Sequence, residues 1–232
     1  MHQSVLDYVR TTVTPEMIRD KMVIEVGSLD VCGSAQPFVK ELKPASFTGI
    51  DLDAGSGVDL VWNAERLLEK FEENSVDFLL TNECMEHVED WKTIINNFKA
   101  VVKPNGYILI TTRSKGFPYH AWPYDFWRYS VDDMKEIFAD FEVIDVRNDP
   151  ETPGVFILAK KPADYKPTVN LDRIKLYSIV KWNRIPALTS ADITDWDIKR
   201  NKMYFSMRFR LANAFPSGLK NRIKGLLYGV KK

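Results

Sequence analysis

The residues best suited to bind a nucleoside follow a short apolar run near the N terminus. Gly27 and Ser28 come directly after Val23–Val26, and Gly33 and Ser34 open the next helical pattern. A strand that stops at a glycine lets the backbone approach a ligand, and the N terminus of the following helix offers unpaired N–H donors. A glycine after a strand is also a common plain turn, so this signal needs support from elsewhere in the chain.

Two further groups supply that support. Asp51 ends the second apolar run, 24 residues past Gly27, where a carboxylate can accept hydrogen bonds from both hydroxyls of a ribose. Asp59 and the Asn63–Ala64 pair accompany the third run, placed to meet the edge of a base. Together the three groups indicate a cofactor that contains a nucleoside, with NAD and S-adenosylmethionine as the two candidates. The G-x-G-x-x-G fingerprint expected for NAD is absent from the sequence.

A second set of chemistry-bearing residues lies in the aromatic segment Gly116–Ser130. It contains His120, Asp125 and Arg128, and its two prolines exclude a continuous helix. Such mixtures stack on a ring and hydrogen-bond its substituents, which is typical of sugar recognition. We therefore expect a substrate-binding lid here. The alternative is an aromatic loop packed under the sheet edge, with Asp125 and Arg128 as a structural ion pair.

The elements that must position these residues alternate between β-rich and helical patterns over residues 1–162. The expected strands are Met22–Val26, Phe47–Leu52, Val58–Trp62, Ser75–Leu80, Tyr107–Thr112, Phe141–Val146 and Val155–Lys160. The expected helices are Ala35–Leu42, Ala64–Glu73, Trp91–Val102 and Asp132–Phe138. This order predicts an α/β, Rossmann-like, doubly wound and mostly parallel seven-stranded sheet that ends in an antiparallel C-terminal hairpin. Ligands of such sheets bind at the carboxyl ends of the strands.

Five segments resemble class I S-adenosylmethionine-dependent methyltransferases, and most closely their small-molecule type 11 branch. The segments are Glu25–Ser28 (EVGS), Gly49–Asp51 (GID), Asn63–Leu67 (NAERL), Val76–Leu80 (VDFLL) with Glu86–Asp90 (EHVED), and Val102–Ile110 (VKPNGYILI). The resemblance covers roughly residues 20–162. It implies S-adenosylmethionine as cofactor and S-adenosylhomocysteine as product.

The resemblance also implies a role for each matching position. Glu25 and Gly27 are expected to flank the methionine portion, and Asp51 to hold the ribose. Asn63–Ala64 is expected at the adenine, and Asn82–Glu83 beside the sulfonium. The expected cofactor-binding residues are Glu25, Gly27, Ser28, Asp30, Asp51, Leu52, Asn63, Ala64, Asn82 and Glu83.

The first glycine motif departs from the pattern of this family. The usual form is E-x-G-x-G-x-G, whereas here Leu29 and Asp30 follow Ser28, and the next glycine is Gly33. We expect a longer and reshaped loop, in which Asp30 either reaches the methionine ammonium or folds the loop.

Methyl transfer to a hydroxyl requires a base, and histidine is the usual one near neutral pH. Of the three histidines, the first lies at the chain terminus and is set aside. His87 follows the fourth expected strand, where it either structures the loop or orients the acceptor. The candidate catalytic residues are therefore His87, His120 and Asp125. No metal site is expected, because no second histidine with ligand spacing accompanies Glu83, Glu86 and His87.

The 232 residues carry 32 basic and 32 acidic side chains, but the two signs separate along the chain. Residues 1–162 hold 17 basic and 27 acidic residues, whereas residues 163–232 hold 15 and 5. We therefore expect a methyltransferase domain at 1–162 and a basic, aromatic-rich C-terminal extension at 163–232. Two cysteines are too few for a disulfide scaffold, and no apolar run reaches the ~18 residues of a membrane span. With no signal-peptide pattern at the N terminus, a cytoplasmic location is expected.

The partner of the extension stays open. Its apolar and basic residues interleave, as in Phe205–Arg210 and Lys220–Tyr228. One interpretation is packing on the acidic domain or on a second subunit of a homodimer. Another is peripheral contact with a membrane surface or an anionic lipid carrier. Nucleic acid is the least supported partner, since no RNA-recognition motif is present.

These features predict transfer of a methyl group from S-adenosylmethionine to a hydroxyl of a sugar, a glycan or a related small molecule. Methylation of RNA or protein is one alternative, supported only by the basic extension. A catalytically idle methyltransferase-like assembly module is another, motivated by the altered first motif. An NAD-dependent dehydrogenase is the least supported.

Overall fold

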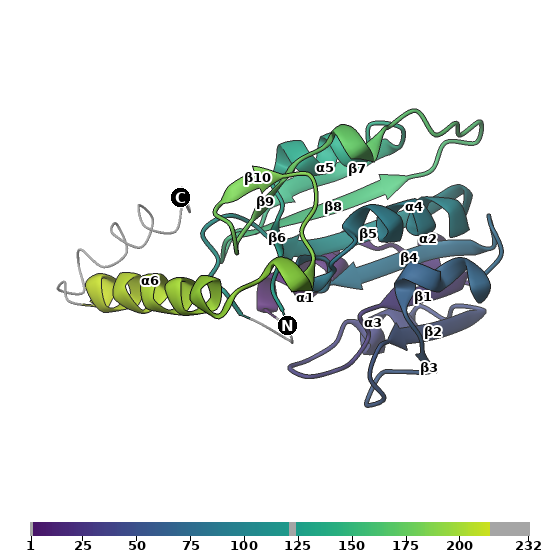
Figure 1. Ribbon diagram of the computed structural model, residues 1–232. Helices are drawn as coiled ribbons and strands as arrows, with labels where there is room; N and C mark the ends of the chain where they lie inside the picture. The colour runs from purple at the N-terminus through teal and green to yellow at the C-terminus, as the bar shows by residue number, and fades with distance from the viewer. Residues whose placement is uncertain (1, 121–123, 214–232) are drawn as a thin grey trace.

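A seven-stranded sheet forms the centre of the computed structural model, which describes residues 2–120 and 124–213 (Figure 1). The strands are β1 (Met22–Val26), β2 (Ser46–Asp51), β3 (Leu60–Val61), β4 (Val76–Asn82), β5 (Val102–Arg113), β7 (Glu142–Asn148) and β8 (Gly154–Lys160). Their order is β3-β2-β1-β4-β5-β8-β7. The first five are parallel, and β8 is antiparallel to both β5 and β7. The predicted α/β fold, with its mostly parallel sheet and closing hairpin, is confirmed.

Helices cover both faces of this sheet. One face carries α1 (Gln3–Thr12), α2 (Pro15–Ile18) and α3 (Gln36–Glu41). The other carries the 3₁₀ helix η1 (Ala64–Glu69), α4 (Trp91–Val101) and α5 (Val131–Ile137) (Figure 1). The central strands are apolar on both sides because each side contributes to a core, as parallel sheets require. Neither face of the central strands is therefore open to a ligand, which leaves the strand ends.

The segment Ala64–Glu73 is not the regular α-helix that its pattern predicts. It forms η1, with non-helical backbone angles at Arg66. Three-residue spacing places Ala64 and Leu67 on the buried side, so Leu68 turns outward and is 43% exposed. Leu67 and Leu68 therefore do not share the buried face that a regular α-helix over Ala64–Glu73 would give them.

The connection from α4 to β5 also differs from the prediction. The sequence predicts that Pro104 stops the helix and that Asn105–Gly106 forms a turn before the strand. Instead α4 passes directly into β5 at Val102, and the pairing with β4 shifts between Val76 and Phe78. Asn105 has a φ of +66°, so the local signal of a turn is absorbed as an irregularity inside a long strand.

A small antiparallel sheet joins residues from both sides of position 162. It contains β6 (Trp127–Arg128), β9 (Leu176–Ser178) and β10 (Asn183–Ile185), in the order β10-β9-β6. Buried apolar side chains of the later segment share one core with α4 and α5; they are Leu171, Ile174, Leu176, Ile179, Val180 and Leu188. The first part of the basic extension is therefore folded against the acidic part.

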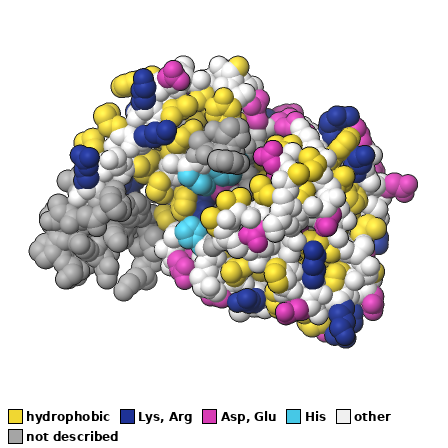
Figure 2. Space-filling model, turned by 90° about the horizontal axis from the view of Figure 1, so that it is seen from below, with side chains coloured by type: hydrophobic (Ala, Val, Ile, Leu, Met, Phe, Trp, Pro, Cys, Tyr) yellow, Lys and Arg dark blue, Asp and Glu magenta, His cyan; other side chains and the backbone are white. Residues whose placement is uncertain are grey.

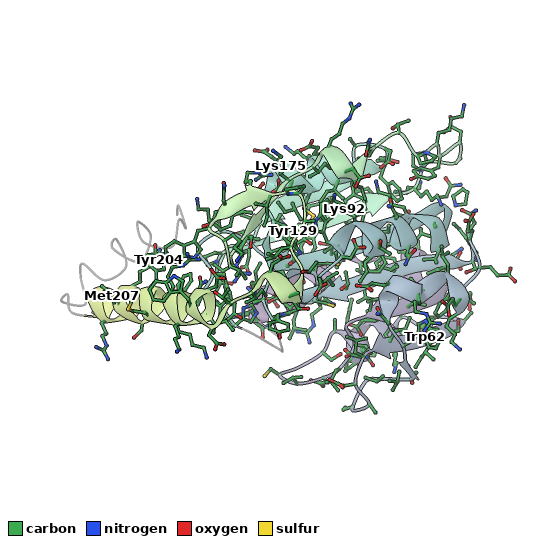
Figure 3. The ribbon with its side chains drawn as sticks, in the orientation of Figure 1. Trp62, Lys92, Tyr129, Lys175, Tyr204 and Met207 are labelled. Atoms are coloured by element: carbon green, nitrogen blue, oxygen red, sulfur yellow. The ribbon has the colours of Figure 1, made fainter. Side chains whose placement is uncertain are left out.

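The helix α6 (Asp195–Asn213) follows and extends away from the sheet (Figure 1). Figure 3 shows Tyr204 and Met207 on this helix, where they are 40% and 56% exposed. The basic and apolar residues predicted as a contact surface at 214–232 lie outside the described residues. Across residues 2–120 and 124–213, no helix is both long and apolar enough to cross a membrane.

Candidate active site

A buried carboxylate marks the carboxyl end of β1. Glu25 is 2% exposed, and its Oε1 accepts a hydrogen bond from Asn82 Nδ2 at 3.3 Å. The other oxygen, Oε2, has no hydrogen-bond partner within the described part of the chain. Burial raises the pKa of Glu25 to about 7, although the Asn82 amide works in the opposite direction. A carboxylate in this setting gains from a cationic partner that supplies both a charge and a donor.

Gly27 follows this strand at a position where a side chain would clash with a neighbouring residue. Its φ is +75°, and a Cβ built there would lie 2.5 Å from Cys84 Cβ. The Gly27 and Ser28 amides both donate to the Ile50 carbonyl, which pins the turn against β2. The Ser28 hydroxyl is buried and, among the described residues, has no partner. The turn therefore combines close backbone approach with an unused polar atom.

The reshaped loop after Ser28 is held by two aspartates. Asp51 Oδ2 accepts from the Leu29 amide at 3.0 Å, and Asp51 itself is half-buried. Asp30 Oδ1 accepts from the Gly33 amide at 2.7 Å, and Asp30 is exposed. Of the two roles considered for Asp30, the folding of the loop is the one that these contacts display.

The remaining candidate cofactor residues line the same edge of the sheet. Asn63 caps η1 by accepting from the Glu65 amide at 2.8 Å, next to the buried Ala64. Leu52 is 66% exposed directly after β2. Asn82 ends β4 and is oriented by the Thr111 hydroxyl, which donates to its Oδ1 at 3.2 Å. The sheet order β3-β2-β1-β4 thus places all of these residues along one row of strand ends.

Glu83, the residue directly after β4, has a strained backbone conformation. It has a φ of +55°, and its carboxylate pairs with the buried Arg113 at the end of β5. Positive φ is uncommon for a residue with a side chain and is often found at functional sites. The sequence did not single out Arg113, because its role depends on the strand pairing that brings β5 beside β4.

The aromatic segment after β5 is tied down by a buried ion pair. Asp125 and Arg128 are both fully buried and form a two-pronged contact of 2.5 Å and 2.7 Å. Burial alone would raise the pKa of Asp125, but the guanidinium of Arg128 holds it well below its usual range. Arg128 also donates to the Pro118 carbonyl at 3.0 Å, so the pair is tied to the part of the segment that precedes His120.

His120 extends from that ion pair toward the end of β4. Its Nδ1 lies 3.1 Å from Asp125 Oδ2, and its Nε2 lies 3.7 Å from Glu86 Oε1. Burial lowers the tendency of His120 to protonate, but the two carboxylates outweigh it and raise the pKa of His120 to about 9. The side chain remains 40% exposed, so one edge of the ring faces outward. Figure 2 shows histidine side chains at a hollow in this face, beside hydrophobic and charged side chains.

Glu86 and His87 complete the group from the 3₁₀ helix η2 (Met85–His87). Glu86 is fully buried, and its Oε2 accepts from the Thr112 hydroxyl at 2.8 Å. His87 Nδ1 lies 2.7 Å from the Tyr124 carbonyl, and the His87 and His120 rings meet edge to face at 4.8 Å. Tyr129, at the centre of Figure 3, donates its hydroxyl to the Met85 carbonyl at 3.2 Å and so holds η2 in place.

The structure thus brings all three candidate catalytic residues together. One metal-ligating atom from each of Glu86, His87 and His120 lies within 4.8 Å of the others. Glu86 was noted in the sequence only beside His87, since nothing local showed that His120 returns to it. Thr112, which orients Glu86, was missed because a threonine inside a strand carries no functional signal.

Comparisons with known proteins point in one direction. A family model described as a methyltransferase domain matches residues 14–141. A stretch of 53 residues is 32% identical to phosphoethanolamine N-methyltransferase 2 of Caenorhabditis elegans, covering 23% of this chain and 12% of that protein. The chain therefore matches only a small part of the length of that curated relative.

Two solved structures show the same fold. One is the methyltransferase named in the complex with the Haloferax volcanii Trm112 methyltransferase activator. It gives a TM-score of 0.57 at 14% identity over 71% of this chain and 91% of that chain. The other is Burkholderia thailandensis 1,6-didemethyltoxoflavin-N1-methyltransferase with bound 1,6-didemethyltoxoflavin and S-adenosylhomocysteine. It gives a TM-score of 0.51 at 16% identity over 68% of this chain and 76% of that chain. At such identities the likeness concerns the arrangement of helices and strands.

Proposed function

The chain belongs to the methyltransferase-domain family and has the class I S-adenosylmethionine-dependent methyltransferase fold, and we propose that it methylates a small-molecule hydroxyl. The acceptor that fits best is a sugar, a glycan or a related metabolite. The observation that carries the proposal is the meeting of two unlike sites at one sheet edge. The turn around Glu25 and Gly27 lies at the ends of β1 and β2, and the cluster around His120 lies beyond the ends of β4 and β5.

The residues at the first site fit S-adenosylmethionine. Glu25 Oε2 is buried and, in the described chain, without a hydrogen-bond partner, which suits the methionine ammonium. A Cβ at Gly27 would clash with Cys84, so the glycine lets the turn after β1 lie directly against the end of β4, where the donor would bind. When bound, the cofactor supplies a methyl carbon already activated by its sulfonium.

The other donor-side residues would hold the nucleoside. Each carboxylate oxygen has more than one lone pair, so Asp51 can accept from ribose hydroxyls while keeping the Leu29 amide. Leu52 and Asn63–Ala64 would lie against the adenine, where an exposed leucine gains from being covered. Ser28 and Asp30 would border the methionine portion. Asn82 and Glu83, held by Thr111 and Arg113, would face the sulfonium end.

The second site would receive and activate the acceptor. Asp125 fixes one nitrogen of His120, and the other nitrogen faces the Glu86 carboxylate. Because the pKa of His120 is raised to about 9, its second nitrogen would accept a proton from a hydroxyl only in the neutral form that forms at higher pH, whereas Glu86 could accept a proton in its ionised form. His87 lies against this pair and would help to orient the acceptor. Methyl transfer needs the hydroxyl oxygen in line with the methyl carbon, and such positioning is worth up to about 7–11 kcal/mol.

Binding of S-adenosylhomocysteine tests the donor half. We expect calorimetry on the full chain to detect binding, and Asp51→Ala to weaken it about tenfold or more, since a hydrogen bond to a charged group contributes about 1.5–3 kcal/mol. Asp53→Ala is the matched control, because Asp53 is exposed on the same loop. Absence of binding, or undiminished binding in Asp51→Ala, would overturn the donor assignment.

Transfer of a labelled methyl group tests the acceptor half. The panel contains sugars, glycans and sugar nucleotides, together with amines, RNA and unrelated proteins. We expect incorporation into hydroxyl compounds. Incorporation confined to amines, RNA or protein would replace the hydroxyl proposal, and intact donor binding without any transfer would favour an assembly module.

A further inference from the structure

We propose that Glu86, His87 and His120 form a binding site for one divalent first-row transition-metal ion, with Zn²⁺ as the best-fitting probe. Two imidazoles and one carboxylate are a donor set that binds Zn²⁺ and leaves a further coordination position open. The sequence alone predicts no metal site, because a second histidine with ligand spacing is missing near His87. The fold supplies it from the loop after β5.

Each of the three side chains is held by a hydrogen bond on the atom that a metal would not use. The Tyr124 carbonyl can only accept, so His87 Nδ1 carries the proton and Nε2 keeps its lone pair. His120 Nδ1 donates to Asp125 in the same way, leaving Nε2 toward Glu86. Backbone carbonyls and carboxylates are the usual outer partners of metal-binding histidines, because they fix the ring and its tautomer.

The third ligand shows the clearest sign of a missing partner. Glu86 is fully buried; its Oε2 accepts from Thr112, while Oε1 lacks a hydrogen-bond partner anywhere in residues 2–120 and 124–213. An unsatisfied carboxylate oxygen at such depth costs free energy unless something completes it. That oxygen lies 3.7 Å from His120 Nε2 and 3.9 Å from Arg113 Nε, so its two charged neighbours both lie beyond hydrogen-bond distance.

The distances suit a metal ion after a small adjustment. Two ligands of a tetrahedral ion at about 2.05 Å lie roughly 3.3 Å apart. The Glu86–His120 pair, at 3.7 Å, is already near that separation. The widest separation in the group is at most 4.8 Å, so the three ligand atoms would have to draw together by about 1.5 Å or less.

The charges around the site also call for a cation. Four carboxylates lie here with little or no exposure: Glu83, Glu86, Asp125 and Asp149. Only two guanidinium groups, Arg113 and Arg128, face them in the described structure. The formal balance is two negative charges when His120 is neutral, which one divalent ion would neutralise, and one negative charge when His120 is protonated. Buried charges without compensation are costly, so this imbalance favours a dication over an empty site.

At its open coordination position the ion could bind and activate the acceptor hydroxyl, a role that rests on the proposed function. A hydroxyl oxygen bound there would lose its proton more readily, because a divalent ion stabilises the alkoxide. The proton would pass to solvent, and the oxygen would then be ready to attack the methyl carbon. The alternative is that Glu86 and His120 form only an ion pair, with His120 protonated between two carboxylates.

Metal binding is tested on the full chain without an affinity tag, because a tag would add histidines. After treatment with a chelator, we expect calorimetry to show one Zn²⁺ per chain with a Kd of about 1 µM or lower. His87→Ala and His120→Ala should each weaken binding by more than the ~10–100-fold that loss of an outer partner causes. Thr112→Val removes the hydroxyl that orients Glu86, and should weaken binding about tenfold. Cobalt substitution adds an absorption spectrum as a second readout.

The controls separate a missing site from a misfolded protein. His2→Ala removes the histidine outside the cluster and should leave Zn²⁺ affinity unchanged. Urea unfolding serves as the folding check for each variant. Failure of the wild type to bind Zn²⁺, Co²⁺ or Mn²⁺ would overturn the proposal in favour of the ion pair. Undiminished Zn²⁺ binding in both histidine variants would overturn it as well. Because metal binding is measured without donor or acceptor, the site can stand even if methyl transfer to hydroxyls fails.

Discussion

The pKa of Glu25 makes donor binding depend on pH in a calculable way. With a pKa of about 7, the carboxylate of the free protein is about 9% ionised at pH 6 and about 76% ionised at pH 7.5. If only the ionised form pairs with the methionine ammonium, the affinity for S-adenosylhomocysteine rises about eightfold over that interval. The same linkage predicts release of about 0.9 protons per ligand at pH 6 and about 0.2 at pH 7.5.

The substitution Glu25→Gln keeps the shape of the side chain and removes its charge. We expect the variant to bind with the same affinity at pH 6 and pH 7.5 and to release no proton from this site. At pH 7.5 it should bind about 10- to 150-fold more weakly than the wild type, the equivalent of losing about 1.5–3 kcal/mol from a charge-assisted hydrogen bond. The physical reason is that the Asn82 and Gln36 side chains beside the buried carboxylate are neutral, and one oxygen has no hydrogen-bond partner among the described residues and is left for the ligand.

Calorimetry in buffers of different ionisation enthalpy measures both the affinity and the proton count. Glu41→Gln is the matched control, since Glu41 is exposed on α3 and should keep the full pH dependence. An affinity that does not change between pH 6 and pH 7.5 would refute the reasoning. So would a Glu25→Gln variant that behaves as the wild type does.

Three further predictions follow from the same contacts. Without ligand, the raised pKa of Glu25 stabilises the folded protein fully below about pH 4.5, and this contribution is lost as the pH rises through about 7. Glu25→Gln should therefore raise the free energy of unfolding at pH 8, by at most about 3 kcal/mol, when measured by urea unfolding. An unchanged urea midpoint would count against this. Gly27→Ala should cost about 1–3 kcal/mol and lower S-adenosylhomocysteine affinity at least tenfold, because the methyl group meets Cys84 at positive φ; normal stability and binding would contradict the close approach. Asp125→Asn should destabilise by about 3–5 kcal/mol, because it leaves the buried Arg128 without its charge partner, and a loss below 1 kcal/mol in urea unfolding would show that water reaches the pair.

The interpretation of the aromatic segment combines both alternatives raised by the sequence. The Asp125–Arg128 pair is a structural contact, as one alternative held, and it is fully buried. The same carboxylate also holds His120, which is the residue that reaches the candidate acceptor site. A structural ion pair and a positioning role are therefore compatible, because a carboxylate has two oxygens and several lone pairs.

The sequence by itself determined the existence and chain order of the seven strands of the main sheet and the position of the donor-side candidates after them, but not the small sheet of β6, β9 and β10. Those features depend on local information: short apolar runs form the strands, and the polar or glycine residues after them emerge at one edge of the sheet. Gly27 and Asp51 could be chosen because each directly follows or ends such a run, whereas Glu25 was chosen from the resemblance of its motif to the methyltransferases. Local signals were misleading where the backbone had a second option, as in η1 and the irregular start of β5.

Only the tertiary structure decided which side chains meet around Glu86. His120 lies in a segment without periodicity, so no local pattern shows where the chain returns. Its place depends on the buried Asp125–Arg128 pair and on the pairing of β6 with β9, which lies about fifty residues further along the chain. Contacts of this kind form because distant segments bury polar and apolar groups together, and the free energy of that burial belongs to the assembled core rather than to any stretch of sequence.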